Sequence, residues 1–268
     1  MTRAVLIKGV LLALAFYVLA AVLARLIAAR ALHYPELASR RAPDAVQKIR
    51  GDDGNEIAFL HLPNPCARFT IWFFHGNAED LGDLEPWLHV LRNAGYSVFA
   101  FDYPGYGLSG GTPSESAIYA AARTVRGYLR DQLEVAPADT LLYGRSIGGG
   151  PAVQMATEES VGGTVLQSTF TSVYRVLTGS RILPFDYFEN ERKLARVACP
   201  TLIMHGTRDE VIPFAHGKAL LAAAREPKRS LWVEGAAHND FLIVAGRSHW
   251  DALRDFSEFC AQRLDAQP

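Results

Sequence analysis

The stretch LLYGRSIGGGP (141–151) places Ser146 between an apolar run and a row of glycines. Gly144 and Gly148 lie two residues before and two residues after this serine, which is the spacing of a sharp turn from a strand into a helix. Small residues there let the two segments approach each other, and the exposed hydroxyl then lies at a helix N-terminus, which favours developing negative charge. A non-catalytic serine in a tight turn would have the same sequence pattern, so the role of Ser146 depends on the rest of the chain.

Short apolar runs alternate with helical patterns on both sides of this stretch. We expect strands at 69–74, 96–102, 140–144, 163–168, 201–206 and 230–235. Helices are expected at 84–95, 114–133, 146–158, 213–225 and 248–264. This alternation predicts an α/β protein with a mostly parallel sheet and helices on both faces. Two further runs, 45–51 and 55–62, flank the turn signal DDG and predict an antiparallel hairpin at one edge of the sheet.

A serine hydroxyl at neutral pH needs a general base, and the sheet predicts where to look for one. Asp209 follows the run 201–206, and His238 follows the run 230–235. Both residues are therefore expected at the carboxyl ends of strands, where functional loops of such sheets gather. Taken alone, Asp209 would fit a loop-capping carboxylate and His238 a surface-loop histidine. The chain order Ser146, Asp209, His238 matches the order of nucleophile, acid and base in catalytic sites on this kind of sheet.

Three neighbouring groups fit these roles less well. Glu210 is adjacent to Asp209 and is expected to point elsewhere. His249 falls in the closing helix rather than in a loop. Asp240 is too close in sequence to His238 to be its expected orienting partner.

Acyl transfer also needs two backbone N–H groups that hold a developing oxyanion. Ile147, directly after the serine, is the first candidate, and Asn77, in the loop HGNAED after the run 69–74, is the second. We expect His75 in that loop to be a structural hydrogen-bonding residue. The Gly- and Pro-rich loop 102–113 fits a substrate cradle and a rigid connection equally well.

With these motifs assembled, the sequence resembles the α/β-hydrolase superfamily over about residues 45–264. The pieces that carry the resemblance are FFHGNAED, FDYPGYGLSGG, GRSIGGGP, HGTRDEVIP and GAAHND. The set is most similar to membrane-anchored serine hydrolases of the bud-emergence type and to the depalmitoylating α/β-hydrolase-domain proteins. The resemblance implies an eight-stranded sheet and ester or thioester hydrolysis without a cofactor. It also implies that Ser146 is the nucleophile, Asp209 the acid and His238 the base.

The sequence departs from these relatives in three places. It lacks the cysteine-rich N-terminus of the depalmitoylases, HGNAED has two acids where relatives often have smaller residues, and Pro104 stands where an arginine is frequent. The segment 171–199 is too short for the large helical cap of many lipases, so we expect a minimal cap and an open site. A small apolar wall for an acyl chain is expected from Leu183, Phe185, Tyr187 and Phe188.

The N-terminal run 9–29 is apolar except for Arg25. Its 21 residues, at 1.5 Å each, span about 31 Å, which matches the hydrocarbon core of a bilayer. We therefore expect a membrane anchor at 1–31, a linker at 32–44 and an α/β-hydrolase catalytic domain at 45–268.

A cleaved secretory signal is the alternative for this run, since Arg3 and Lys8 precede it and a small-residue site ends at Ala31. In that case the domain would be secreted or periplasmic. For a single-pass anchor, the basic residues after the run outnumber those before it, which favours a cytoplasmic domain. The basic residues that follow its uninterrupted apolar stretch, 9–24, are Arg25, Arg30, Arg40 and Arg41.

The composition excludes several other classes of function. The net charge is −1 and the basic runs are short, which argues against nucleic-acid binding. The three cysteines are far apart, so we expect neither a disulfide framework nor a metal site. No phosphate-binding glycine motif is present. We therefore expect a membrane-tethered serine hydrolase that acts on a small-molecule or lipid-like acyl substrate without cofactor or metal. The alternative is a non-catalytic binding protein of the same fold, and the oligomeric state is left open.

Overall fold

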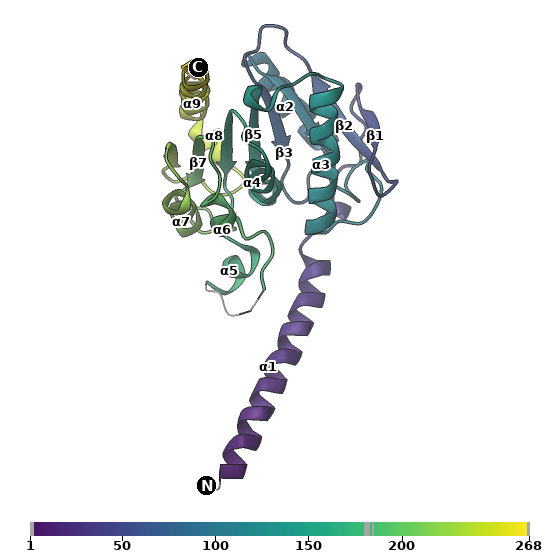
Figure 1. Ribbon diagram of the computed structural model, residues 1–268. Coiled ribbons are helices and arrows are strands. Elements are labelled where there is room, and N and C mark those ends of the chain that lie inside the picture. Colours follow the sequence, from purple (N-terminus) through teal and green to yellow (C-terminus); the bar gives the residue numbers. More distant parts are fainter. Residues whose placement is uncertain (1–2, 180–182, 184, 267–268) are drawn as a thin grey trace. The chain divides into compact units, whose positions relative to one another are not determined.

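The computed structural model describes residues 3–179, 183 and 185–266, apart from the side chains of Arg3, Ala4 and 25–31. The chain divides between Tyr34 and Pro35 into two compact units. The first unit contains helix α1 (Arg3–Ala31), and the second contains the sheet and the other helices (Figure 1).

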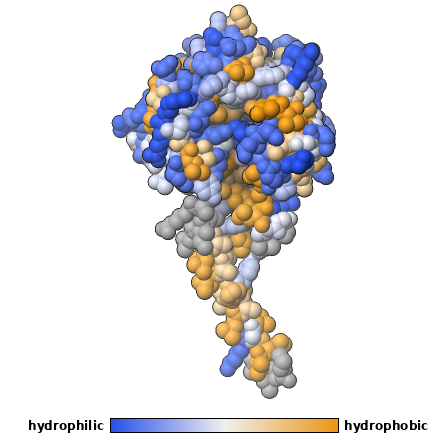
Figure 2. Space-filling view, turned by 180° about the vertical axis from the view of Figure 1, so that it is seen from behind, coloured by the Kyte–Doolittle hydropathy of each residue, from blue (hydrophilic) through white to orange (hydrophobic). Residues whose placement is uncertain are grey.

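Helix α1 contains the run expected to be a membrane anchor. Its segment Val5–Ala24 has 20 residues and is long and apolar enough to cross a bilayer. Large apolar side chains such as Phe16 are exposed along it, and Figure 2 shows this apolar surface in orange. A signal sequence meets the same test of length and composition, so α1 is a candidate for either role. The side chain of Arg25 lies outside the described part of the chain.

Within the described residues, eight strands form one sheet in the order β1-β2-β4-β3-β5-β6-β7-β8. The strands are β1 (Gln47–Arg50), β2 (Glu56–Leu62), β3 (Thr70–Phe74), β4 (Ser97–Phe101), β5 (Thr140–Arg145), β6 (Gly163–Gln167), β7 (Thr201–Gly206) and β8 (Lys228–Val233). The pairs β1–β2 and β2–β4 are antiparallel, and all the other pairs are parallel. This confirms the predicted mostly parallel sheet with a hairpin at one edge.

Helices cover both faces of the sheet (Figure 1). The helices of the second unit are α2 (Leu81–Asn93), α3 (Glu115–Asp131), α4 (Gly149–Glu158), α5 (Val173–Thr178), α6 (Asn190–Leu194), α7 (Ala215–Ala223), α8 (Phe241–Ala245) and α9 (Arg247–Asp265), with short 3₁₀ turns η1 (Pro35–Leu37), η2 (Pro137–Asp139) and η3 (Ser146–Gly148). Two of the helices begin at side-chain caps. Asp80 accepts a hydrogen bond from the Asp83 amide at the start of α2, and Ser114 accepts one from the Ala117 amide at the start of α3.

Alternate side chains of the strands face the two helical layers. Residues of α2, α8 and α9 pack on one face in a single apolar cluster that includes Leu88, Phe241, Phe256, Phe73 and Tyr143. On the other face, Phe59 stacks on Phe99 and contacts Tyr128 of α3, with a ring separation of 4.9 Å to that tyrosine. A strand covered on both faces reads as a continuous apolar run. The short central runs of the sequence were predictable for this reason.

Candidate active site

Ser146 lies at the carboxyl end of β5, where the chain turns sharply into η3 and then α4. Its φ angle is +53°, a left-handed conformation that side chains other than glycine rarely adopt. The Thr169 hydroxyl donates a hydrogen bond to the Ser146 carbonyl oxygen at 2.6 Å and holds the turn from the neighbouring strand. The serine is half-buried, whereas Gly144 before the turn and Ile147 within it are buried. The strain at this position therefore presents the hydroxyl outward.

The glycines around Ser146 allow this turn because other elements pass very close to them. A Cβ atom on Gly144 would lie 2.6 Å from the Gly148 carbonyl oxygen, and one on Gly148 would lie 2.1 Å from the Phe74 carbonyl oxygen. A Cβ atom on Gly150 would lie 2.2 Å from the ring of Phe188. The glycine row thus lets the start of α4 pack directly against the end of β3.

The side chains of Ser146, His238 and Asp209 form one hydrogen-bonded series. His238 Nε2 lies 3.1 Å from Ser146 Oγ, and His238 Nδ1 lies 2.8 Å from Asp209 Oδ2. An ionised carboxylate can only accept, so Nδ1 carries the proton that is donated to Asp209. Nε2 is then the ring nitrogen left to accept from the serine hydroxyl. The structure brings together the three residues that the sequence predicted from separate loops.

Asp209 is held as a carboxylate by its surroundings. Burial raises its pKa, but hydrogen bonds from His205, His238 and the Ile212 amide outweigh burial and hold the pKa well below its usual range. The amides of Val211 and Ile212 both donate to Oδ1, at 3.0 and 2.7 Å, which leaves Oδ2 for His238. His205, not singled out in the sequence, lies four residues earlier on β7, and its Nε2 is 3.4 Å from Oδ2.

The groups that fitted less well in the sequence have other partners. Burial lowers the pKa of His249 to about 4, and its Nε2 lies 3.0 Å from the Tyr143 hydroxyl. Asp240 accepts a hydrogen bond from the Ala237 amide at 2.7 Å. Glu210 is exposed. Neither of the two contacts involves His238 or Asp209.

The loop 75–80 after β3 lies against the turn that carries Ser146. His75 donates from Nδ1 to the Gly76 carbonyl oxygen at 2.7 Å, and its Nε2 accepts from the Tyr103 amide at 3.3 Å. Burial lowers the pKa of His75 to about 4, so this ring is neutral and already bonded at both nitrogens. The Tyr106 hydroxyl donates to Asn77 Oδ1 at 2.6 Å. His75 therefore has the structural role expected of it, and the side chain of Asn77 is held in place.

Among the described residues, no group of three or more His, Cys, Asp or Glu side chains is arranged to hold a metal ion. The cysteines are unpaired with one another, and Cys199 and Cys260 are buried. Burial raises the pKa of Cys260 to about 12, which keeps this thiol protonated and unreactive.

Comparisons with known proteins identify the family of this chain. A family model described as serine aminopeptidase, S33, matches residues 65–182. Human alpha/beta hydrolase domain-containing protein 17B is 38% identical over 243 residues, which cover 87% of this chain and 83% of that protein. The chain belongs to this family of α/β-hydrolase domain-containing proteins. It is a serine hydrolase by family, and the α/β-hydrolase fold expected from its motifs is confirmed.

Two further comparisons cover a similar part of the hydrolase. The alpha/beta hydrolase domain-containing protein aho-3 of Caenorhabditis elegans is 38% identical over 214 residues, which cover 78% of this chain and 64% of that protein. The esterase Pf2001 of Pyrococcus furiosus superposes with a TM-score of 0.68 at 17% identity, over 80% of this chain and 91% of that one. At that identity the likeness is one of fold.

One of the departures noted in the sequence, the two acids of HGNAED, lies at the site of this hydrolase. Glu79 forms an ion pair with Arg145, the residue directly before Ser146, and also accepts from the Gly76 amide at 2.8 Å. Both charged side chains are 21% exposed. Glu79 therefore connects loop 75–80 to the turn that carries Ser146. Asp80, the second acid, is fully buried and caps α2.

Loop 102–113 is held by several hydrogen bonds to Asp102. Asp102 accepts hydrogen bonds from the Leu81 and Leu108 amides, at 2.8 and 2.9 Å. A Cβ atom on Gly107 would lie 2.2 Å from Asp102 Oδ2, so the loop closes around this carboxylate. Its Tyr103 ring stacks on His75 with centroids 3.7 Å apart. Of the two readings left open by the sequence, these contacts favour the rigid connection, and the loop buttresses loop 75–80.

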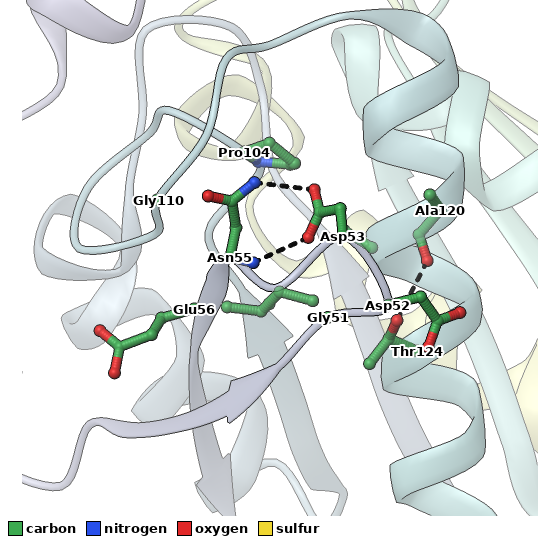
Figure 3. A pocket seen from close by; sticks show the side chains of 11 residues that line it. Gly51, Asp52, Asp53, Asn55, Glu56, Pro104, Gly110, Ala120 and Thr124 are labelled. Atoms are coloured by element: carbon green, nitrogen blue, oxygen red, sulfur yellow. Dashed lines mark hydrogen bonds between the residues drawn. The ribbon is translucent and has the colours of Figure 1, made fainter.

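Pro104, the third departure, lines a pocket beside the hairpin β1–β2 and helix α3 (Figure 3). The figure shows Asn55 beside Asp53 and below Pro104, and Asp53 accepts from the Asn55 amide and side chain at 2.9 and 2.8 Å. The lining of this pocket contains neither Ser146 nor His238.

Between β6 and β7 the described residues contain two short helices, α5 and α6. Phe188 is completely buried, with its ring 5.8 Å from that of Tyr119, and it packs against Gly150. It is therefore a core residue, and the expectation that it lines an apolar wall for an acyl chain was wrong. The rings of Phe185 and Tyr187 both contact Tyr174, and Leu183 is half-buried.

Proposed function

We propose that this hydrolase cleaves carboxylic ester or thioester bonds through a catalytic triad of Ser146, His238 and Asp209. The observation that carries the proposal is the continuous series from Ser146 Oγ to His238 Nε2 at 3.1 Å and from His238 Nδ1 to Asp209 at 2.8 Å. A histidine between a hydroxyl and a carboxylate can take the serine proton as the oxygen attacks. Asp209, held ionised, keeps the ring in the required tautomer and stabilises the imidazolium that forms.

The two steps of the reaction use the same base. Ser146 Oγ bonds to the acyl carbon, and the carbonyl electrons move onto oxygen, where the amides of Ile147 and Asn77 are proposed to hold the negative charge. The tetrahedral intermediate collapses, and His238 returns its proton to the departing alcohol or thiol. Water then attacks the acyl-enzyme with His238 as base and releases the acid and free Ser146. The contact of Gly148 with the end of β3 supports this pairing of amides, since it brings the turn and loop 75–80 together.

We further propose that the protein is tethered to a membrane by residues 1–31 and that residues 45–268 form the catalytic domain. Most of the segment expected as a linker at 32–44 belongs to the same compact unit, which begins at Pro35. The apolar length of Val5–Ala24 supports a single-pass anchor. The basic residues that follow the run favour a cytoplasmic domain. A tether of this kind suits substrates whose acyl chains are lipid-like. If the mature protein is soluble and begins near Leu32, the N-terminus is a cleaved signal and the anchor is refuted.

Labelling with a fluorophosphonate probe tests the nucleophile. The full-length protein in detergent micelles should be labelled, Ser146→Ala should not be labelled, and Ser116→Ala, an exposed serine on α3, should be labelled like the wild type. Failure of the folded wild-type protein to label would refute the proposal. Hydrolysis of oxyester and thioester series of increasing acyl length then identifies the substrate class, since the resemblance to depalmitoylating proteins makes both bond types relevant.

A further inference from the structure

The chain directly after helix α1 is bonded to the hydrolase unit. Residues 35–44, here called the latch segment, begin with the turn η1 and then run along the N-terminal end of α2. The Ser39 amide donates to Asp83 Oδ2 at 3.1 Å, and the Asp44 amide lies 3.4 Å from Glu85 Oε1. Although the sequence predicted a linker at 32–44, this part of it belongs to the compact unit that begins at Pro35.

The strongest of these contacts are made to Asp80. The Ser39 hydroxyl donates to Asp80 Oδ1 at 2.7 Å, and the Arg40 amide donates to Asp80 Oδ2 at 2.5 Å. Asp80 also accepts from the Asp83 amide as the cap of α2, and it is 0% exposed. A fully buried carboxylate needs every one of these donors, because an unmet acceptor in a buried place costs about 1–3 kcal/mol or more.

The fit between the latch segment and α2 leaves no room for a side chain. The Arg41 side chain donates to the Gly82 carbonyl oxygen. A Cβ atom on Gly82 would lie 2.3 Å from the Arg41 carbonyl oxygen and 2.8 Å from Ser39 Oγ. Arg40 has a φ angle of +53°, so the segment adopts a specific strained backbone at this contact.

Asp80 is also the last residue of loop 75–80, three positions after Asn77. The beginning of this loop is held by Tyr103 and Tyr106. Its far end is held by Asp80, whose carboxylate is shared between α2 and the latch segment. A displaced latch segment would therefore remove the Ser39 and Arg40 donors from Asp80 and loosen this end of the loop that bears the Asn77 amide.

We propose that the latch segment and Asp80 position the oxyanion-hole loop, so that the chain leaving the membrane helix is part of the active-site framework. The inference rests on the proposed function, because it assigns the Asn77 amide to the oxyanion. Misplacement of a catalytic group by about 1 Å can lower a rate by about 10²-fold. Partial release of the loop should therefore cost about 10-fold in kcat.

Gly82→Ala tests this without changing a proposed catalytic residue, because the new methyl group wedges the latch segment away from α2. Gly127→Ala is the matched control. Gly127 lies inside α3 with no atom within 4 Å of the added Cβ, so this variant gains the same helix propensity without a clash. Both variants are made in the full-length protein in detergent micelles. The measurements are kcat and KM on a p-nitrophenyl ester, the Ki of a trifluoromethyl ketone that forms a tetrahedral adduct with serine, and the thermal midpoint.

We expect Gly82→Ala to lower kcat about 10-fold and to raise the Ki of the trifluoromethyl ketone by a similar factor. KM should stay within about two-fold of that of the control. A role in folding alone would lower the thermal midpoint and leave kcat and Ki of the folded enzyme unchanged, which would refute the proposal. If Gly82→Ala does not fold, Ser39→Ala removes one donor to Asp80, and a kcat equal to wild type would then refute it. An inactive, unlabelled wild-type protein would instead refute the proposed function, so the two failures are distinguishable.

Discussion

The ion pair between Glu79 and Arg145 offers the sharpest quantitative test of the site. Glu79 makes two charge-assisted contacts, one to Arg145 and one to the Gly76 amide at 2.8 Å, and both charged side chains are 21% exposed. A hydrogen bond to a charged group contributes about 1.5–3 kcal/mol when buried. Allowing for partial screening by solvent, we expect Glu79→Ala to lower the free energy of unfolding by about 2–3 kcal/mol. Arg145→Ala should cost about 1–2 kcal/mol.

A double-mutant cycle isolates the pair itself. The free energy of unfolding is measured by urea titration in detergent micelles for the wild type, both single variants and the double variant, with tryptophan fluorescence as the signal. We expect a coupling energy of about 1–2 kcal/mol, above the 0.2–1 kcal/mol typical of exposed pairs. The rate of fluorophosphonate labelling should fall in both single variants, because the pair connects loop 75–80 to the nucleophile turn. A coupling energy below about 0.5 kcal/mol, with unchanged labelling rates, would refute this account of the pair.

Three further predictions concern the triad and the nucleophile turn. Asp209→Asn should lower kcat by about 10³- to 10⁴-fold with little change in KM, because the ring of His238 loses its orienting acceptor; activity within 10-fold of wild type would contradict the assigned role. The pKa of Asp209 lies below its ordinary value in the folded state, so its carboxylate stabilises the fold above about pH 4 and this contribution is lost as the pH falls through the folded pKa. The thermal midpoint of Asp209→Asn should therefore decline less than that of the wild type between pH 5 and pH 2, and parallel declines would rule this out. Gly148→Ala places a methyl group 2.1 Å from the Phe74 carbonyl oxygen and should lower the free energy of unfolding by about 1–3 kcal/mol relative to Gly127→Ala, an expectation that equal urea midpoints would overturn.

Local patterns were enough to predict most of the elements of this hydrolase. The run 201–206 coincides with β7, because a strand buried on both faces is apolar throughout. The last strand was expected at 230–235 but lies at Lys228–Val233, since β8 is a half-exposed edge strand whose limits come from its pairing with β7. Helix α2 was expected from residue 84 but begins at Leu81, because Asp80 caps it. The five-residue helix α8 was not predicted, as it is too short to show a period.

Some residues of the proposed site could be predicted from local patterns, whereas the place of others depended on the packing of the whole chain. The glycine spacing and the position of each loop after a strand pointed to Ser146, Asp209 and His238, because the carboxyl ends of parallel strands meet at one edge. Phe188 was misread as a lining residue, because an aromatic residue in a loop has the same local pattern whether it faces a ligand or the core. Its burial against Gly150 follows from the path of the whole chain.

What the sequence alone determined was the order of chemistry along the chain: an elbow serine, then an acid, then a base, each placed by a short-range pattern of strand and turn. Only the tertiary structure decided the contacts between distant residues. His238 meets Ser146 across 92 positions, Arg145 meets Glu79 across 66, and Ser39 meets Asp80 across 41. Such pairs form because the packing of the sheet and helices brings distant segments of the backbone close together. The periodicity of the sequence does not predict these contacts. For the stretch LLYGRSIGGGP, the sequence therefore indicated an elbow, and the fold supplied the partners around it.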